Sequence, residues 1–463
     1  MRQTFKNYLN TLMDKKVAVI GLGISNAPLV DALLEAGIYT IVRDKRTAGE
    51  LGGEAENLSN RGAILKLGEH YLDELSEDVI FRTPGLMPSN PAILEAVKNG
   101  AELTSEMETF FKVCPCKKIG ITGSDGKTTT TSIIAELLKN QAENVYVGGN
   151  IGTPLLTAAD DMKDDDIAVL ELSSFQLISM KESPDIAVIT NISPNHLNIH
   201  GDLDEYIDAK RNIYMHQKPC DRVVLNKDRE ITRDFAKTAP ADEILFFSHR
   251  SRLINGVFLE DGVIYEAREG KITEITRAED ILLPGAHNLE NYMAAFAAVR
   301  DLVSIDVMRE TGKTFKGVEH RIELVRERGG VLYYNDSIAS SPTRTIAGLR
   351  SFDKKVILIA GGKDKGITFD ELAAEINMRV KKLVLTGMAA NQIYGAVINA
   401  PGFSEKLEIV MRDDFTEAVL EASKSAVAGD IVLLSPACTS FDRFRNFEER
   451  GNLFKDIVNG VQH

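Results

Sequence analysis

The stretch "GITGSDGKTTTTS", residues 120–132, contains residue types that can hold a nucleoside triphosphate. Lys127 can neutralise phosphate oxygens and the Thr128 hydroxyl can ligate Mg²⁺, as in the phosphate loops of ATPases. The ordinary loop begins with a glycine where this chain has Ile121. The stretch is therefore an ordinary phosphate loop, a chance resemblance, or a variant with its own chemistry.

The sequence around the loop favours a genuine nucleotide site. Residues 117–123 are predicted to form a strand and residues 124–140 a helix, because apolar residues recur at helical spacing. Further buried strands are expected at 165–174 and 184–193, which predicts an open parallel sheet. In this context Gly123 and Gly126 would let backbone N–H groups surround a phosphate at the start of the helix.

Two polar residues at the ends of these strands are candidate metal ligands. Glu171 lies at the end of the first strand and His196 follows the second, on the edge of the sheet where ligands gather. A histidine can also be an ordinary surface or core residue, but this position favours a ligand. Lys210 lies on an expected helix, "YIDAKRNIYM", where spacing alone predicts a solvated side chain.

The N-terminal segment predicts a second nucleotide-binding unit. Strand 15–20, helix 27–37 and strand 38–46 form a βαβ pattern, and residues 78–85 fit the same sheet. The turn keeps two glycines of the dinucleotide fingerprint, but Asn26 replaces the third, and Asp44 follows where a ribose-binding acid would lie. The turn could bind a dinucleotide or another nucleotide diphosphate, or serve only packing.

A third segment begins near Glu319 and again alternates strands with helices, which predicts another layered α/β domain. In this segment Arg321 suits a triphosphate and Asp336 suits a ribose, although both types are common at strand ends. Just before it, Asn288 and Asn291 begin a helix with His287, where the amides could cap the helix or hold a base.

Length and composition limit the class of protein. A chain of 463 residues predicts about three domains, and a net charge of -14 gives no general attraction for nucleic acid or an anionic membrane. Because no apolar run is long enough for a membrane span or a signal peptide, we expect a cytoplasmic protein. The four cysteines form neither a disulfide framework nor a complete zinc site, so reduced thiols are expected.

Taken together, the motifs resemble the Mur ligase family along nearly the whole chain. They are, in order, "GITGSDGKTTT", "GGNIGTP", "ELSSFQL", "TNISPNHLNIHG", "HNLENYMAA", "EHRIELV", "NDSIASSP", "GGKDKG" and "SPACTSFDRFRNFEERG". The closing motif is most similar to that of the member that adds D-glutamate. The family's own loop is GxxGxGK[ST], which this chain matches, so the displaced glycine is a family variant.

The resemblance implies an α/β protein of three domains. These are a Rossmann-like domain for the UDP-substrate at 1–105, a central P-loop ATPase-like parallel-sheet domain at 106–317, and a Rossmann-like domain for the amino acid at 318–463. Because the substrates are held on different domains, we expect domain closure with hinges near Glu106 and Gly317.

The matching motifs also imply roles for individual residues. The implied ATP-binding residues are Gly123, Ser124, Asp125, Gly126, Lys127, Thr128, Thr129, Asn291, Arg321 and Asp336. The implied metal ligands are Thr128, Glu171, His196 and Lys210, where Lys210 matches a lysine carbamylated by CO₂. The implied catalytic residues are Lys127, Lys210 and His196. The implied UDP-substrate residues are Ile24, Ser25, Lys45, Arg46 and Asn150, and the implied D-glutamate residues are Ser340, Lys365, Ser440, Phe441 and Phe447.

The implied reaction is ATP-dependent addition of D-glutamate to UDP-N-acetylmuramoyl-L-alanine through an acyl phosphate, with two Mg²⁺ ions, in a monomer that serves peptidoglycan precursor synthesis. Asn195 and Asn198 replace two aspartates found in relatives, Ile338 replaces a lysine found in some, and Ser340 replaces a threonine.

Other classes fit less of the sequence. A sibling ligase for another amino acid stays open, because the choice of D-glutamate rests on the C-terminal motifs. A folylpolyglutamate synthetase shares the loop but needs no UDP site, and a nicotinamide dehydrogenase would leave Lys127 unexplained. A nucleotide-dependent switch would not require an amino acid for ADP release.

Overall fold

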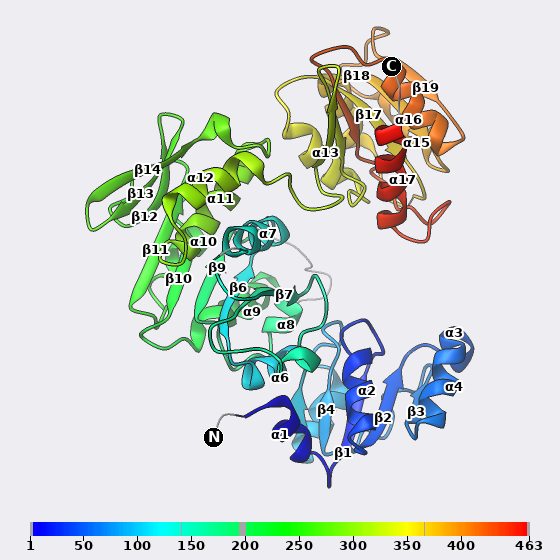
Figure 1. Cartoon of the computed structure of the whole chain (residues 1–463). Coiled ribbons are helices and arrows are strands. Elements are labelled where there is room, and N and C mark those ends of the chain that lie inside the picture. The colour runs from blue at the N-terminus through cyan, green and yellow to red at the C-terminus, as the bar shows by residue number, and fades with distance from the viewer. Residues whose placement is uncertain (1–2, 140, 194–200, 365, 461–463) are drawn as a thin grey trace. The chain divides into compact units, whose positions relative to one another are not determined.

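The computed structural model describes residues 3–139, 141–193, 201–364 and 366–460. The chain folds into two compact units. The first comprises Met1–Ala278 with Glu290–Thr311, and the second comprises Glu279–Leu289 with Gly312–His463. Figure 1 shows two separate sheets in the first unit and one sheet in the second.

The first sheet is parallel throughout and has the order β3-β2-β1-β4-β5. Its strands are β1 (Lys16–Ile20), β2 (Tyr39–Asp44), β3 (Ile64–Leu67), β4 (Val79–Phe81) and β5 (Glu102–Thr104). Its helices are α1 (Phe5–Asn10), α2 (Ala27–Glu35), α3 (Ala48–Leu51), α4 (Gly53–Asn60) and α5 (Pro91–Lys98). The predicted βαβ unit is confirmed as β1, α2 and β2, and β4 joins the same sheet as expected.

The central sheet has the order β14-β13-β12-β11-β10-β9-β6-β8-β7. Its parallel part comprises β6 (Lys117–Thr122), β7 (Val145–Gly149), β8 (Ile167–Glu171), β9 (Ile186–Ile189), β10 (Arg222–Asn226), β11 (Glu243–Ser248) and β12 (Gly256–Glu260). An antiparallel extension follows with β13 (Val263–Arg268) and β14 (Lys271–Arg277). The sequence predicted β6, β8 and β9 but not this extension.

Helices of the central region are α6 (Glu106–Val113), α7 (Lys127–Leu138), α8 (Ser174–Leu177), α9 (Leu203–Met215), α10 (Glu230–Phe235), α11 (Ala286–Val299) and α12 (Ile305–Thr314), with short 3₁₀ turns η1 (Leu156–Ala158) and η2 (Ala278–Asp280). The parallel strands are apolar on both faces because helices cover both, and β8 and β9 are buried at every position. This arrangement leaves the carboxyl edge of the sheet for polar side chains.

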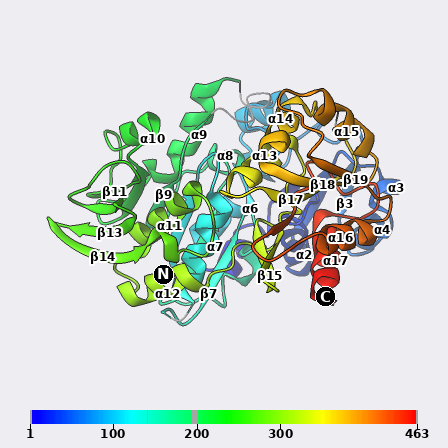
Figure 2. The ribbon, with the colours of Figure 1, turned by 90° about the horizontal axis from the view of Figure 1, so that it is seen from above.

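The third sheet has the order β15-β16-β20-β17-β18-β19 and is parallel except for β15. Its strands are β15 (Glu323–Arg328), β16 (Val331–Asn335), β17 (Val356–Gly361), β18 (Val380–Thr386), β19 (Glu408–Met411) and β20 (Ile431–Leu434). Its helices are α13 (Pro342–Arg350), α14 (Asp370–Arg379), α15 (Ala390–Asn399), α16 (Phe415–Lys424) and α17 (Phe447–Gly460). Figure 2 shows α14 and α15 on one side of β17 and β18, and α16 and α17 on the other.

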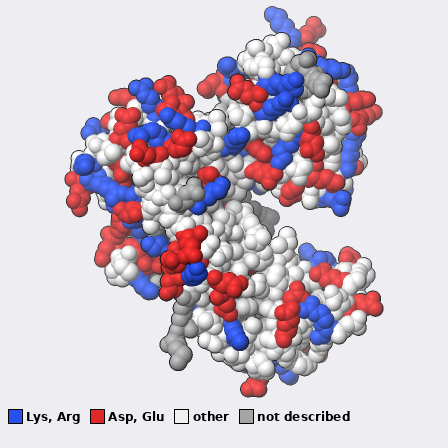
Figure 3. All heavy atoms as spheres, in the orientation of Figure 1, with Lys and Arg blue, Asp and Glu red and all other residues white. Residues whose placement is uncertain are grey.

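The distribution of surface charge and the character of the helices can be compared with the expectations about nucleic acid and membranes. On the face drawn in Figure 3, acidic and basic side chains are interspersed and form no continuous basic surface. Among the described helices, none combines the length and the apolar character that crossing a bilayer requires.

Helix α6 links the first sheet to the central sheet and begins with a buried carboxyl group. Ser105 caps the helix by accepting a hydrogen bond from the backbone N–H of Glu108 at 3.2 Å. The Glu106 side chain accepts a hydrogen bond from the backbone N–H of Leu156 at 3.1 Å. Burial raises the pKa of Glu106 from the ordinary 4.5 to about 7, although these backbone donors oppose the rise.

We predict that Glu106→Gln stabilises the protein in a pH-dependent way. The raised pKa means that the native state favours the neutral acid. The neutral Glu106 carboxyl group therefore contributes fully to the stability of the folded protein below pH 4.5, and this contribution is lost as the pH rises through 7. Glutamine keeps the acceptor oxygen and stays neutral. At pH 8 the free energy of unfolding of the variant should exceed that of the parent by up to about 3 kcal/mol. At pH 5 the difference should be below about 1 kcal/mol.

The measurement is the urea unfolding midpoint at both pH values, with Glu95→Gln as the control because Glu95 is exposed on α5. If the unfolding midpoints of Glu106→Gln and the parent differed by the same amount at pH 5 and pH 8, this prediction would be contradicted.

Candidate active site

The phosphate loop between β6 and α7 has a backbone that only glycine fits at two positions. Gly123 and Gly126 have φ angles of 152° and 79°. A Cβ atom on Gly123 would lie 1.9 Å from the Thr190 hydroxyl, and one on Gly126 would lie 2.3 Å from Oδ1 of Asn291. The two glycines therefore serve both the turn and the close packing of the loop, which supports a built loop over a chance match.

The end of β9 holds the loop from the adjacent position in the sheet. The backbone N–H groups of Ser124 and Asp125 donate to the carbonyl and the side-chain oxygen of Asn191, at 2.9 and 3.0 Å. The Thr190 hydroxyl donates to the Asp125 carbonyl at 2.6 Å. Sequence reasoning missed Thr190 and Asn191, although the pairing of β9 with β6 places both beside the loop.

Two lysines converge on one backbone carbonyl of the loop. The ammonium groups of Lys127 and Lys210 each donate to the carbonyl oxygen of Gly123 at 2.9 Å. Lys127 also donates to the Ser124 carbonyl at 3.0 Å. The Lys210 Nζ lies 4.8 Å from the centre of the Tyr206 ring.

Lys210 is almost fully buried, so the expectation of a solvated side chain, drawn from spacing alone, is wrong. Burial lowers the pKa of its amine well below the ordinary value, and the nearby charge of Lys127 lowers it further. A buried lysine of this kind is poised to be a neutral nucleophile, which indicates function more often than structure.

Glu171, at the end of β8, is arranged as a cation ligand. Its Oε1 accepts a hydrogen bond from the side-chain amide of Asn150 at 2.9 Å, and its carbonyl accepts from the Asn150 backbone N–H at 2.7 Å. Its Oε2 is buried and has no hydrogen-bond partner within the described part of the chain. A buried carboxylate oxygen left without a donor fits an oxygen-seeking ion such as Mg²⁺.

The other implied residues of the loop region lie as follows. Thr128 is half-buried in the first turn of α7, Thr129 is buried, and Asp125 is exposed. Asn291 lies on α11 against Gly126, and its Oδ1 accepts a hydrogen bond from Thr130 at 3.3 Å. His196, Asn195 and Asn198 lie outside the described residues.

At the start of α11, the two asparagines have different roles. The Asn288 side chain donates to the Pro284 carbonyl at 2.6 Å, so it stabilises the turn before the helix. This bond differs from a helix cap, in which the side-chain oxygen accepts from a backbone N–H. Asn291 instead packs against the phosphate loop. The spacing of the two residues alone could not separate these roles.

The glycine turn of the first sheet is a closed polar arrangement. The Asn26 side chain donates to the carbonyls of Ile20 and Gly21, at 3.2 and 3.0 Å, which explains how asparagine replaces the third glycine. Asp44 is buried, which would raise its pKa, but hydrogen bonds from Arg46 and from the Leu22 N–H lower the pKa to about 2.

Because both Asp44 oxygens are occupied in this way, Asp44 orders the turn and Arg46. The side chains of Ile24 and Lys45 are exposed beside it, while those of Ser25 and Arg46 are partly exposed. The predicted UDP-substrate residues of the turn are thus available at the surface, and Asn150 lies in the central sheet region.

In the second unit, Asp336 follows β16 and is buried with partners. Its carboxylate accepts hydrogen bonds from the Ser435 hydroxyl at 2.7 Å and from the Ile322 N–H at 3.3 Å. Burial raises its pKa to about 7 against these bonds and the charge of Arg321. His320 and Ile322, on either side of Arg321, both have positive φ, at 62° and 45°, a strain that often marks functional segments.

The closing motif is held by a buried arginine that sequence reasoning missed. The Arg450 guanidinium donates to the Ser337 carbonyl and hydroxyl at 2.8 and 3.0 Å, and to the Cys438 carbonyl at 3.2 Å. Burial lowers the pKa of Arg450 to about 10. A long basic side chain at the start of a helix gives no sequence signal of such burial.

The predicted amino-acid residues lie on the segments that Arg450 joins or next to them. Ser440 is buried, Ser340 is partly buried, and Phe441 has an exposed fraction of 64%. The ring of Phe447 packs edge-on against His320, with centroids 6.0 Å apart. Lys365 lies outside the described residues.

Comparisons with known proteins identify the family of this chain. Sequence profiles of the Mur ligases match residues 15–105 (Mur ligase MurD-like, N-terminal domain), 121–299 (Mur ligase middle domain) and 320–438 (Mur ligase, glutamate ligase domain). The chain belongs to the Mur ligase family and has its three domains.

Within the family, the chain is similar to particular ligases of known name. The chain is 48% identical to a UDP-N-acetylmuramoylalanine--D-glutamate ligase of Clostridium novyi and 49% identical to one of Acetivibrio thermocellus, and each match covers 100% of both chains. Among solved structures, it shares its fold with the UDP-N-acetylmuramate-alanine ligase of Thermotoga maritima, with a TM-score of 0.57 at 19% identity over 97% of this chain and 100% of the other. The MurF ligase of Thermotoga maritima, solved in complex with ADP, matches with a TM-score of 0.55 at 21% identity, over 97% of this chain and 96% of the other.

We predict that Glu171→Gln weakens Mg²⁺-dependent nucleotide binding without unfolding the protein. The amide keeps the oxygen that accepts from Asn150 but replaces the unpartnered carboxylate oxygen by a donor and removes the negative charge. Affinity for a non-hydrolysable ATP analogue with Mg²⁺, measured by calorimetry, should fall about tenfold or more, which is about 1.4 kcal/mol.

The control is Glu143→Gln, because Glu143 is an exposed acid paired with Lys163 in the same unit. Equal affinities of Glu171→Gln and the parent in the presence of Mg²⁺ would contradict a metal-ligand role for Glu171.

Proposed function

We propose that this chain is an ATP-dependent ligase that adds D-glutamate to UDP-N-acetylmuramoyl-L-alanine in peptidoglycan precursor synthesis. The observation that carries the reaction type is the phosphate loop with the buried Lys210 amine against it and the partnerless Glu171 oxygen near the same edge of the sheet. The full-length identity of 48–49% to proteins named as D-glutamate ligases supports the substrates.

The chemistry requires activation because a carboxylate is a poor electrophile. The carboxylate of the UDP-substrate attacks the γ-phosphorus of ATP, so that ADP leaves and an acyl phosphate forms. The amine of D-glutamate then attacks the acyl carbon, phosphate leaves, and the amine loses a proton. Such phosphoryl transfer depends mainly on positioning and on neutralising charge.

Several residues of this chain would perform these tasks. Backbone N–H groups of the loop would cradle the phosphates, and Lys127 would exchange its loop carbonyl partners for the β- and γ-phosphate oxygens. Thr128, Glu171, His196 and a modified Lys210 would hold two Mg²⁺ ions, whose chemistry would be to neutralise developing negative charge on phosphate.

We further infer that Lys210 carries a carbamate when the enzyme is active. A neutral amine adds CO₂ to give an N-carboxylate and releases one proton. The strongly lowered pKa of Lys210 supports this, because only the neutral amine has the lone pair needed for attack. The modification would replace a desolvated cation by an anionic oxygen ligand.

The amino acid would bind on the C-terminal domain. We propose that Ser340, Lys365, Ser440, Phe441 and Phe447 select D-glutamate, and that Arg321 and Asp336 contact the nucleotide. Closure of the domains would then bring the bound substrates together, in a cytoplasmic monomer that has access to ATP.

The function is tested by phosphate release from ATP and Mg²⁺ with UDP-N-acetylmuramoyl-L-alanine, with D-glutamate, L-glutamate, L-lysine and meso-diaminopimelate tested side by side. Release that depends on D-glutamate alone is expected. Release with another amino acid would retain the ligase but reassign its substrate, and no release with any of them would refute the catalytic proposal.

The carbamate gives a separate prediction. Protein equilibrated with ¹³CO₂ should show a carbamate carbon signal in its NMR spectrum, and Lys210→Arg should lose that signal because a guanidinium does not add CO₂. Lys227→Arg is the control, because Lys227 lies over the Phe246 ring on the same unit. Retention of the signal in Lys210→Arg would assign the modification to another amine.

A further inference from the structure

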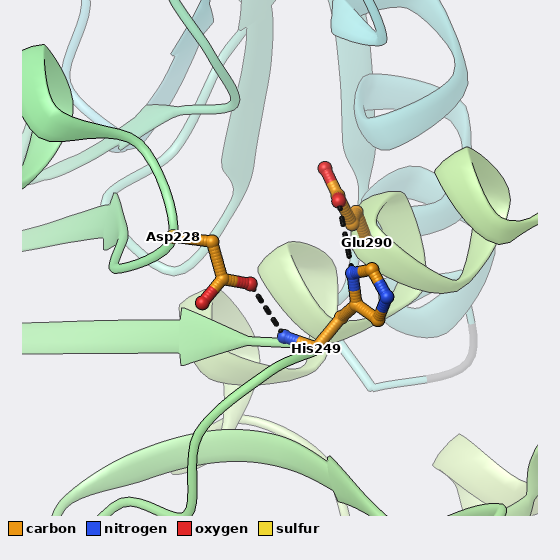
Figure 4. Close-up of side chains that lie close together, drawn as sticks. All are labelled: Asp228, His249 and Glu290. Atoms are coloured by element: carbon orange, nitrogen blue, oxygen red, sulfur yellow. Dashed lines mark hydrogen bonds and ion pairs between the residues drawn. The ribbon is translucent and has the colours of Figure 1, made fainter.

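A second group of metal-ligating side chains lies along the carboxyl edge of the central sheet. Asp228 follows β10, His249 follows β11, and Glu290 lies on α11 (Figure 4). One potential ligand atom from each of the three lies within 4.8 Å of the others. None of the three belongs to the ATP, UDP-substrate or amino-acid residues described above.

The spacing of the histidine and the glutamate is unusual for a hydrogen bond. Nδ1 of His249 lies 3.4 Å from Oε1 of Glu290, beyond the usual hydrogen-bond range of about 2.7–3.2 Å. Within the described chain this buried nitrogen has no hydrogen-bond partner. Two ligands of a tetrahedral ion, each about 2.0–2.2 Å from the metal, are separated by about 3.4 Å.

Neighbouring groups fix the two carboxylates without using all their lone pairs. Asp228 accepts hydrogen bonds from the Ser248 hydroxyl at 2.6 Å and from the backbone N–H of His249 at 2.8 Å. The side-chain amide nitrogen of Asn226, which is fully buried, lies 3.4 Å from Oε2 of Glu290, so any hydrogen bond between them is long and weak. Each carboxylate oxygen has two lone pairs, so a carboxylate that accepts these hydrogen bonds can still bind a metal ion. In metal sites, hydrogen bonds of this kind hold the ligating side chains in position.

We propose that Asp228, His249 and Glu290 form a site for a divalent transition metal of the Zn²⁺ type, with water as a fourth ligand. One imidazole and two carboxylates suit Zn²⁺ better than Mg²⁺, which prefers oxygen ligands alone. All three side chains are partly exposed, although Nδ1 of His249 itself is buried.

A metal at this position would tie α11 to β10 and β11. Glu290 directly precedes Asn291, which packs against Gly126 of the phosphate loop. Binding of the ion would therefore fix the helix that supports the loop, a structural role that does not rest on the proposed reaction.

The test uses the full-length protein dialysed against Zn²⁺ in a large excess of Mg²⁺, which occupies the oxygen-rich sites. Bound zinc is measured for the parent, for His249→Gln and for Glu290→Gln. We expect the parent to bind one more equivalent than either variant, or to bind it at least tenfold more tightly. His216→Gln is the matched control, because His216 is an exposed histidine of the same unit.

A second measurement identifies the ligands directly. With Co²⁺ in place of Zn²⁺, the parent should show visible d–d absorption without a thiolate charge-transfer band, and His249→Gln should lose it. Circular dichroism without metal checks that the variants are folded. If the parent and both variants bind equal zinc, or if the parent shows no such Co²⁺ spectrum, the three residues form only an ion pair and the proposal is wrong.

Discussion

The structure of the active site depends on two amines, one buried and one partly buried, that meet at one backbone carbonyl. Lys127 and Lys210 both donate to the Gly123 oxygen, and two cations this close repel each other in a medium of low dielectric. The cost is relieved if Lys210 is neutral or converted to an anion, and if phosphate neutralises Lys127. The loop is thus suited to a polyanion, and the proposed carbamate on Lys210 would remove the repulsion between the two lysines.

The sheet explains how this arrangement is held. Strands β6, β8 and β9 end side by side, so the loop, Glu171 and the pair Thr190 and Asn191 meet at one edge. Buried apolar faces fix the strands, and the hydrogen bonds that the carbonyl and the side-chain oxygen of Asn191 accept fix the loop. The glycines then allow an approach that any side chain would prevent. In the second unit, hydrogen bonds from a buried side chain likewise hold loops in place, because Arg450 joins the segments that contain Ser337 and Cys438.

Sequence reasoning recovered the parts of this picture that have local signals. Strand, loop and helix around Lys127 follow from apolar periodicity, and Glu171 follows from its place at a strand end. The burial of Lys210 could not be read from spacing, because it depends on how α9 packs against β6 and the loop. Arg450 and Thr190 were missed for the same reason, because the groups they contact are distant in sequence. The antiparallel strands β13 and β14 pair in consecutive hairpins with β12 and with each other, so they were missed although their partners are local. The family resemblance supplied what periodicity could not, above all the proposal that Lys210 is carbamylated.

The most direct test of the account is the fate of the substrate carboxylate oxygens. UDP-N-acetylmuramoyl-L-alanine labelled with ¹⁸O in its carboxylate would be turned over with ATP and D-glutamate, and the released phosphate analysed by mass spectrometry. An acyl phosphate predicts one ¹⁸O atom in each phosphate, because the bridging oxygen leaves with the phosphoryl group. Phosphate without the label, released together with amide product, would contradict the account.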